Sequence, residues 1–222
     1  MLWIVAALLL SAEQPIQRFC DDTWKAPRPV VEDLRAGRDI ALTISERLPP
    51  YHFHIEADPD CGGIRQIEVR TPAKLLVQTL RVDDSEAPFI GSKFFLAEDL
   101  NFDGFRDLMC LTYWGATGNT FYSVWLFNPK SHLFEPSAEL SKLGNLNADV
   151  KTREITSGGV GGMAGNIYGR SIYKWREGRL VLVSSEHQDW DPKTRCFVRT
   201  TKTLGGPRPR TRRKKVCDPD WK

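Results

Sequence analysis

The segment from Asp99 to Asp107 constrains the fold of this chain more than any other. It reads D-L-N-F-D-G-F-R-D, so oxygen-bearing side chains stand at alternate positions ahead of a glycine. A Ca2+ ion takes about six to eight oxygen ligands, and a glycine at position 104 permits the tight turn that would wrap them around one ion. The predicted calcium ligands are the side chains of Asp99, Asn101, Asp103 and Asp107 and the backbone carbonyl of Phe105.

The residues on either side of this loop indicate a strand–loop–strand site. The flanks read FFLAEDL and FRDLMCL, and the stretch after Asp107 holds no Glu of the kind that closes an EF-hand. The ion would be structural, because it would cancel the repulsion among three carboxylates. It would stabilise the fold by about 2.7 kcal/mol at a hundredfold excess over its Kd. The alternative is a solvated acidic turn that binds no metal.

Short apolar runs separated by turn residues predict an all-β protein. Its 17 Gly, 14 Pro and 10% aromatic residues favour strands and turns. The expected strands are 40–45, 51–56, 64–70, 75–82, 89–96, 108–114, 120–127, 132–135, 151–156, 167–175, 180–185, 194–203 and 211–217. Such spacing suits a sandwich, a barrel or a propeller. We expect one irregular β-propeller-like domain of short antiparallel strands over residues 39–222, with short helical turns only in 139–150.

The first twelve residues have the pattern of a signal peptide. Leu2 to Leu10 is an unbroken apolar run that is too short to span a bilayer, and the small residues Ser11 and Ala12 follow it. We expect cleavage after Ala12, an irregular segment over 13–38, and no membrane span. The alternatives are a buried N-terminal strand or a misassigned start.

Five cysteines in an exported protein predict disulfide pairs with one thiol left over. The expected spare is Cys110, which lies in an apolar run where cysteine behaves as a small hydrophobe. The expected pairs are Cys196–Cys217, which would close a C-terminal hairpin, and Cys20–Cys61, although spacing alone does not fix the connectivity.

The run SGGVGGMAGNIY at 157–168 predicts a flexible loop, since 158–165 holds five glycines in eight positions. A phosphate-binding loop would need a following helix and a Lys, and here a strand pattern follows. A thin loop ending in Tyr168 instead suits insertion into the cleft of another protein, with the tyrosine as anchor. The alternative is a long hairpin connection with Tyr168 as core filler.

Residues 207–215 hold six basic side chains and no acidic one, while the net charge of the whole chain is only +3. The segment Arg208–Lys215 therefore suits an anionic surface such as lipid head groups or an envelope polymer. The alternative is a solvated hairpin rim. The rest of the chain is net acidic, which argues against a general nucleic-acid surface. Because no HExxH or GxSxG motif occurs, we expect no enzymatic activity.

Three stretches together carry a resemblance to a known family: EDLNFDGFRDL, NTFYSVWLFNPKSHLFE and SGGVGGMAGNIYGRSIYKWREGRLVLVSSE, within about residues 90–187. The chain resembles the calcium-binding, propeller-like periplasmic immunity proteins that are paired with type IV secretion effectors and inhibit lysozyme-like peptidoglycan hydrolases. The loop from Asp99 to Asp107 also resembles the calcium site of FG-GAP repeats.

The resemblance implies that a small-Gly-x-x-Tyr loop enters the active cleft of the hydrolase. Here Ala164-Gly165-Asn166-Ile167-Tyr168 matches, with Ala164 where the inhibitors often have Ser. The implied contact residues are Gly161, Gly162, Ala164, Gly165, Asn166 and Tyr168. We therefore expect a periplasmic, calcium-binding inhibitor of a cell-wall hydrolase. The alternative is a calcium-stabilised structural or adhesion module of the envelope.

Overall fold

The computed structural model describes residues 38–57, 63–82, 94–206 and 208–217. The expected signal peptide (1–12), nearly all of the expected irregular segment (13–38) and the expected pair Cys20–Cys61 lie outside these residues. None of these residues belongs to a helix with the length and hydrophobicity that a membrane span requires.

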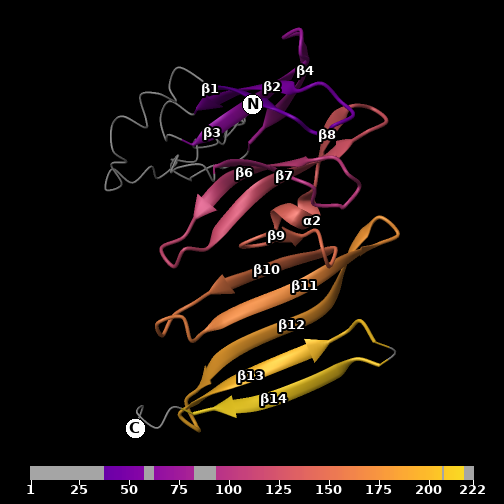
Figure 1. Ribbon diagram of the computed structural model, residues 1–222. Coiled ribbons are helices and arrows are strands. Elements are labelled where there is room, and N and C mark those ends of the chain that lie inside the picture. The colour runs from indigo at the N-terminus through magenta and orange to yellow at the C-terminus, as the bar shows by residue number, and fades with distance from the viewer. Residues whose placement is uncertain (1–37, 58–62, 83–93, 207, 218–222) are drawn as a thin grey trace, which may run out of the picture.

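Three antiparallel sheets follow one another along the chain, and neighbouring strands in each sheet are consecutive in sequence (Figure 1). Sheet 1 contains β1 (Arg38–Leu42), β2 (Tyr51–Ala57), β3 (Ile64–Arg70) and β4 (Leu76–Arg81). Sheet 2 contains β5 (Phe95–Glu98), β6 (Asp107–Trp114), β7 (Thr120–Asn128) and β8 (Leu133–Pro136). Sheet 3 contains β9 (Asn147–Asp149), β10 (Glu154–Val160), β11 (Tyr168–Arg176), β12 (Arg179–Asp191), β13 (Cys196–Thr203) and β14 (Arg210–Val216).

The strands form where the sequence alternates with the period of an extended chain. In β3 the side chains of Ile67 and Val69 are buried, whereas the alternating Gln66, Glu68 and Arg70 are partly exposed. Successive side chains of a strand point to opposite faces, so one face of sheet 1 is apolar and packs inward. The helix α2 (Ala138–Ser141) is the one helix among the described residues, and it begins where Ser137 accepts a hydrogen bond from Leu140 N.

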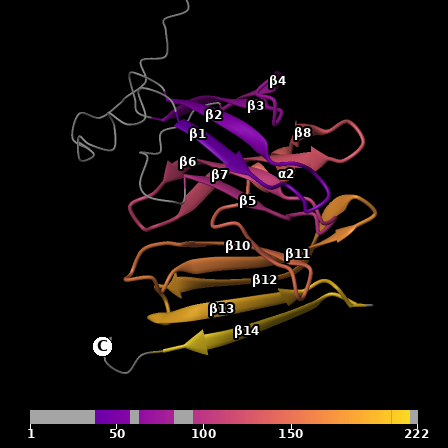
Figure 2. The same ribbon diagram turned by 45° about the horizontal axis from the view of Figure 1, so that its top comes forward.

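The core lies mainly between sheets 1 and 2. Four aromatic rings pack edge to face there, with Phe127 and Phe134 centroids 5.1 Å apart and Tyr51 and Phe53 against them. Edge-to-face packing of this kind adds stability beyond the burial of area. The first strands of sheet 3 reach this core through buried Ile155. By contrast β13 and β14 lie far from it, at the C-terminal end of the molecule (Figures 1 and 2).

Two amide side chains join neighbouring sheets. Each makes the pair of hydrogen bonds, to a backbone N–H and a carbonyl, that a paired strand would make. Gln78 of β4 donates to the carbonyl of Phe134 at 2.8 Å and accepts from its N–H at 2.9 Å. Asn119, just before β7, makes the same pair of bonds to Val160 of β10, both at 2.8 Å. Each amide therefore satisfies the N–H and the carbonyl of one residue in the next sheet, where an unpaired backbone group would be costly.

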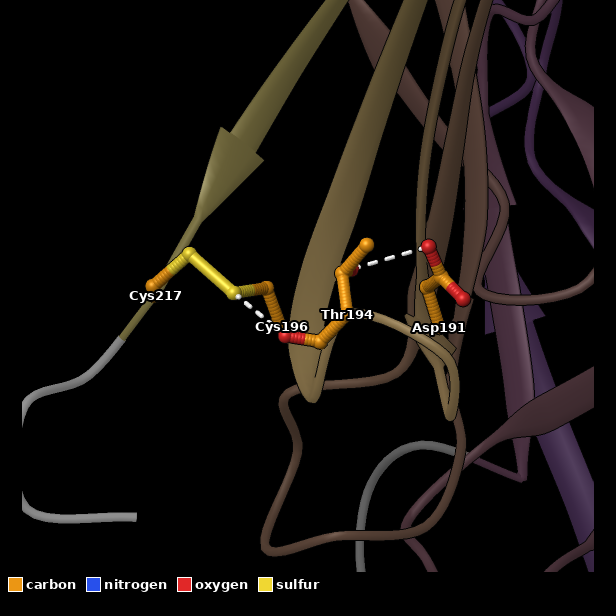
Figure 3. Close-up of a disulfide and its surroundings, with 4 residues drawn as sticks. All are labelled: Asp191, Thr194, Cys196 and Cys217. Atoms are coloured by element: carbon orange, nitrogen blue, oxygen red, sulfur yellow. Dashed lines mark hydrogen bonds between the residues drawn. A yellow bond between two sulfur atoms is a disulfide. The ribbon is translucent and has the colours of Figure 1, made fainter. Parts of the chain in front are cut away.

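The expected disulfide Cys196–Cys217 is present and closes the end of the β13–β14 hairpin (Figure 3). Beside it, Thr194 Oγ1 donates to Asp191 Oδ2 at 2.8 Å and shapes the turn between β12 and β13. Cys110 is a buried free thiol in β6, as expected. Burial there raises the pKa of the thiol far above its ordinary value.

The all-β class and the antiparallel arrangement are confirmed. The described residues form three successive sheets, and no closed propeller or barrel is formed among them. One boundary differs in a way that matters for the site. The sequence predicted a flexible loop from residue 158, but β10 continues through Gly158 and Gly159 to Val160. Pairing with β11 explains this, because Gly158 faces Arg170 and Gly159 faces Gly169 in the ladder.

Candidate functional site

The acidic loop between β5 and β6 is organised by its own side chains. Asp99 accepts hydrogen bonds from Asp103 N at 3.1 Å and from Gly104 N at 2.9 Å. Asn101 Oδ1 accepts from the same Asp103 N at 3.1 Å, and Asp103 Oδ1 accepts from Phe105 N at 2.9 Å. Gly104 has φ +89°, which is the left-handed conformation that this turn requires.

Asp107 occupies a different environment from the other predicted ligands. It is fully buried at the start of β6, where Oδ2 accepts from Leu100 N and Oδ1 from Phe127 N, both at 2.8 Å. Burial raises its pKa to about 7, against the effect of these two hydrogen bonds and with a further rise from Asp103 and Asp99. The side chain therefore fastens the loop to β7 as well as closing it.

All three sheets contact this loop. Arg106 N donates to the carbonyl of Ile44 after β1 at 2.8 Å. From sheet 3, Trp175 Nε1 donates to Leu100 O at 2.8 Å and Arg153 donates to Phe102 O at 2.9 Å. The loop therefore lies where the three sheets meet, and a change in its shape would alter its hydrogen bonds to each of them.

The donor set of the loop is compatible with calcium. Asp99 and Asn101 oxygens converge on one amide N–H, and Asp103 Oδ2 lies 3.0 Å from Asn101 Nδ2, so three of the four predicted side-chain ligands lie together. They present the hard oxygens that Ca2+ prefers. Among the described residues, however, no three His, Cys, Asp or Glu side chains are grouped as a metal site. Both oxygens of Asp99 and both oxygens of Asp107 accept backbone N–H groups.

The glycine loop is a defined hairpin between β10 and β11. Gly161 N donates to Ile167 O at 2.7 Å, and Ile167 N donates to Gly162 O at 3.3 Å. At the tip, Met163, Ala164 and Gly165 have φ values of 55°, 53° and 85°. Three successive left-handed residues are unusual when two carry side chains.

The tip of this hairpin is available to a partner. Gly162 and Ala164 are exposed, whereas Gly165 and Asn166 are partly buried. A Cβ at position 162 would meet no atom within 4 Å. Gln188 Nε2 holds the base of the hairpin by donating to Asn166 O at 2.9 Å.

Tyr168 lies on the face of sheet 3 and is half-buried there. Its hydroxyl donates to Glu186 Oε1 at 2.8 Å, and the guanidinium of Arg199 lies 5.9 Å from its ring centroid. Burial raises the pKa of Tyr168, and the hydrogen bond from Tyr168 lowers the pKa of Glu186. The tyrosine is therefore connected to β12 and β13, and β13 pairs with β14, which carries most of the basic segment.

Two features of the site were not predicted from sequence. Asn119 fixes Val160, the last residue before the hairpin, from the neighbouring sheet. A Cβ on Gly158 would lie 2.6 Å from Gly169 O, so β10 and β11 approach closely just before the hairpin begins. Both residues lie in stretches that the sequence singles out, but each contacts a residue of another strand, and no local pattern reveals that contact.

The basic segment 208–215 forms an exposed loop end and most of β14. A hollow of about 210 Å³ opens on one face of sheet 3 and is lined by Arg199, Thr201, Arg212 and Lys214. The structure thus gathers the hairpin, Tyr168 and part of the basic segment on sheet 3, while the acidic loop lies at the junction of the sheets.

Fold and site together define an all-β protein of three meandering sheets with a rigidly held glycine hairpin. No protein-family model and no curated protein matches the chain. A solved structure does match: a Xanthomonas type IV secretion system related protein, with TM-score 0.50 and 17% identity over 82% of this chain and 99% of that chain. This likeness shows a common fold.

Proposed function

We propose that this protein is a periplasmic, calcium-stabilised inhibitor that binds a lysozyme-like peptidoglycan hydrolase through its glycine hairpin. The observation that carries the proposal is the exposed tip at Gly162 and Ala164 on a hairpin whose base is fixed. The similarity in fold to a protein related to type IV secretion supports the same context as the sequence motifs. We assign the protein a binding activity and no catalytic residue.

The hairpin is suited to a narrow cleft because Gly162, Ala164 and Gly165 at its tip carry almost no side-chain bulk, and Met163 is the one long side chain there. Asn119 and Gln188 restrain it from both ends, through Val160 and Asn166. Restraint before binding lowers the conformational entropy lost in the complex. Tyr168 then supplies a large, rigid contact at the base of the hairpin.

Calcium would act on this site from a distance. Asp99, Asn101 and Asp103 would hold the ion with hard oxygen ligands, and Asp107 would close the loop. Because Trp175 of β11 binds the carbonyl of Leu100, order in the loop is passed to the strand that follows the hairpin. The role of the ion would be structural, without a part in chemistry.

The test is inhibition of peptidoglycan lysis by several lysozyme-like hydrolases, with purified residues 13–222 in the presence of calcium. Tyr168→Ala removes the proposed anchor, and Gly162→Arg places bulk at the tip where the fold has open space. Val150→Arg is the matched control, since Val150 is exposed in the turn at the opposite end of β10. We expect inhibition by the wild type and the control only. Equal inhibition by all four proteins, or by none, would contradict the proposal.

A second candidate is a structural or adhesion module that binds an anionic surface through Arg208–Lys215. It is favoured by the exposure of the basic side chains of β14. Such a module would tolerate Tyr168→Ala but would lose binding to anionic vesicles or envelope polymer when Arg208–Lys215 is deleted.

A further inference from the structure

The strand register of sheet 3 aligns cations from four strands on one face. Residues directly opposite each other in an antiparallel pair lie on the same face. From β11 to β14, two adjacent rows of this face are Arg170, Glu186, Thr201, Arg212 and Tyr168, Gln188, Arg199, Lys214. The neighbouring row adds Arg210 opposite Thr203. We call this surface the Tyr168 face.

The charges of the Tyr168 face are strongly unbalanced. Its cations are Arg170, Arg199, Arg210, Arg212 and Lys214, and its one acidic residue in these rows is Glu186. Glu186 is engaged by the hydroxyls of Tyr168 and Thr201, at 2.8 and 3.2 Å, and lies 4.0 Å from Arg199. Among the described residues, Arg212 and Lys214 form no ion pair, so their charge is available to a ligand.

The cations surround a shared space. Arg199, Arg212 and Lys214 line the hollow of about 210 Å³ together with Thr201. Neighbouring strands are about 4.8 Å apart and residues two apart in one strand are roughly 7 Å apart. A carboxylate that enters the hollow therefore comes within reach of three cations at once.

Protection of the sheet edge explains only part of this surface. Among the described residues β14 is the last strand of sheet 3, and lysine or arginine on an edge strand discourages pairing with other chains. That role does not require Arg199 or Arg170, which lie on the inner strands β13 and β11. Nor does it require the alignment of these cations with Tyr168.

The composition of the face favours a protein ligand over a flexible phosphate polymer. Glu186 lies among the cations and would repel each phosphate that passed over it. A protein segment can place its carboxylates over Arg210, Arg212 and Lys214 alone. The mixture of Tyr and Arg is also typical of protein interfaces. The spacing of Arg210, Arg212 and Lys214 along β14 equals that of alternate side chains in an extended peptide.

We propose that the Tyr168 face binds an acidic, extended segment of a partner protein, with carboxylates at alternate positions lying over Arg210, Arg212 and Lys214, and with Arg199 beside Lys214 on the next strand. The inference rests on the proposed function in that it takes protein binding as the activity of this side of the molecule. It adds the chemistry of the partner, and it extends the contact from the glycine hairpin across β13 and β14.

The test uses a fluorescent peptide, Glu-Thr-Glu-Thr-Glu-Thr-Glu, and a peptide of the same composition with its four Glu contiguous. Binding to the full exported chain is followed by anisotropy at low salt, where charge attraction is least screened. The variant R212E/K214E reverses two charges on the Tyr168 face. Its control K202E/R213E reverses two exposed charges on the opposite face of the same strands. Thermal unfolding checks that both variants are folded.

We expect the alternating peptide to bind more tightly than the contiguous one. R212E/K214E should weaken its binding at least about tenfold, because two attractions become repulsions, and the control should change it less than about twofold. Absence of binding, equal loss in both variants, or equal affinity for both peptides would overturn the proposal. So would tighter binding of an inorganic polyphosphate of equal charge through the same residues.

The outcome is separate from that of the hydrolase experiment. A protein that binds the alternating peptide through Arg212 and Lys214 but inhibits no hydrolase keeps the acidic-segment site and loses only the proposed target. Inhibition that depends on Tyr168, without any binding of the peptide, refutes the acidic-segment site alone.

Discussion

The side-chain amide of Asn119 makes both backbone hydrogen bonds of Val160, with Nδ2 donating to the carbonyl and Oδ1 accepting from the N–H at 2.8 Å each. This contact joins sheet 2 to the last residue of β10, directly before the glycine hairpin. Asn145 supports it, since its Nδ2 donates to Asn119 Oδ1 at 2.9 Å. The hairpin is therefore held by a residue 41 positions away in sequence.

Asn119→Asp should loosen the hairpin and lower the free energy of unfolding by about 1–2 kcal/mol. The aspartate keeps an acceptor for Val160 N–H but loses the donor for Val160 O and places a charge beside it. Urea unfolding measures the stability, and amide exchange at Ile167 reports on the hairpin. Thr117→Ala is the control. It removes the hydrogen bond that Thr117 Oγ1 accepts from Asn119 Nδ2, but it leaves both hydrogen bonds between Asn119 and Val160 in place. An unchanged exchange rate in Asn119→Asp would show that the clamp is dispensable.

Gly158→Ala should destabilise sheet 3 by about 1–3 kcal/mol, because its Cβ would lie 2.6 Å from the carbonyl oxygen of Gly169. The strands β10 and β11 would have to separate just before the hairpin. Gly162→Ala is the matched control, since open space surrounds that position. Thermal or urea unfolding of the two variants makes the comparison, and equal stabilities would contradict the close approach.

Calcium should raise the melting temperature, and EDTA should reverse the change. At a hundredfold excess over Kd the gain is about 2.7 kcal/mol. Asp103→Asn should abolish most of this gain. Asp149→Asn is its control, because Asp149 also accepts backbone hydrogen bonds in an exposed turn, from Lys151 and Thr152, but lies outside the acidic loop. A melting temperature that does not respond to calcium would refute the calcium site.

Asp107→Asn should destabilise the protein even in EDTA. Both Asp107 oxygens accept buried backbone N–H groups, from Leu100 and Phe127. The amide of asparagine offers one oxygen and sets an NH2 group against the other N–H, which costs about 1–3 kcal/mol. Asp103→Asn in the same buffer should change the free energy of unfolding far less, because Asp103 is exposed. Equal losses would show that Asp107 has no separate structural role.

Replacing the disulfide by C196A/C217A should lower stability by about 3 kcal/mol, because the link closes a loop with sequence separation 21. The loss should appear first as faster amide exchange in β14, which is an outer strand of sheet 3. Protection of β14 that survives the double substitution would mean that strand pairing alone holds this edge.

Local patterns in the sequence determined most of the strands. The alternation in Ile64–Arg70 and the apolar run at Leu108–Leu111 can each be recognised within a few consecutive residues, so β3 and β6 could be predicted. The pairing of Cys196 with Cys217 was predictable for the same reason, since both ends of one hairpin meet. The turn at Gly104 also follows from the local motif, because each side chain there bonds to an amide within five residues.

Tertiary structure decided what distant segments do to one another. Gly158 belongs to a strand because β11 pairs with it, although its own sequence indicates a loop. Asp107 holds the acidic loop against β7 because its buried carboxylate accepts a hydrogen bond from Phe127 N–H. No sequence pattern around Asp107 reveals this contact. The Tyr168 face exists because the register places Arg199 opposite Lys214 and Tyr168 opposite Gln188. The local sequence of this chain encodes its turns directly. The register of the strands and the contacts between the sheets depend on the packing of the whole molecule.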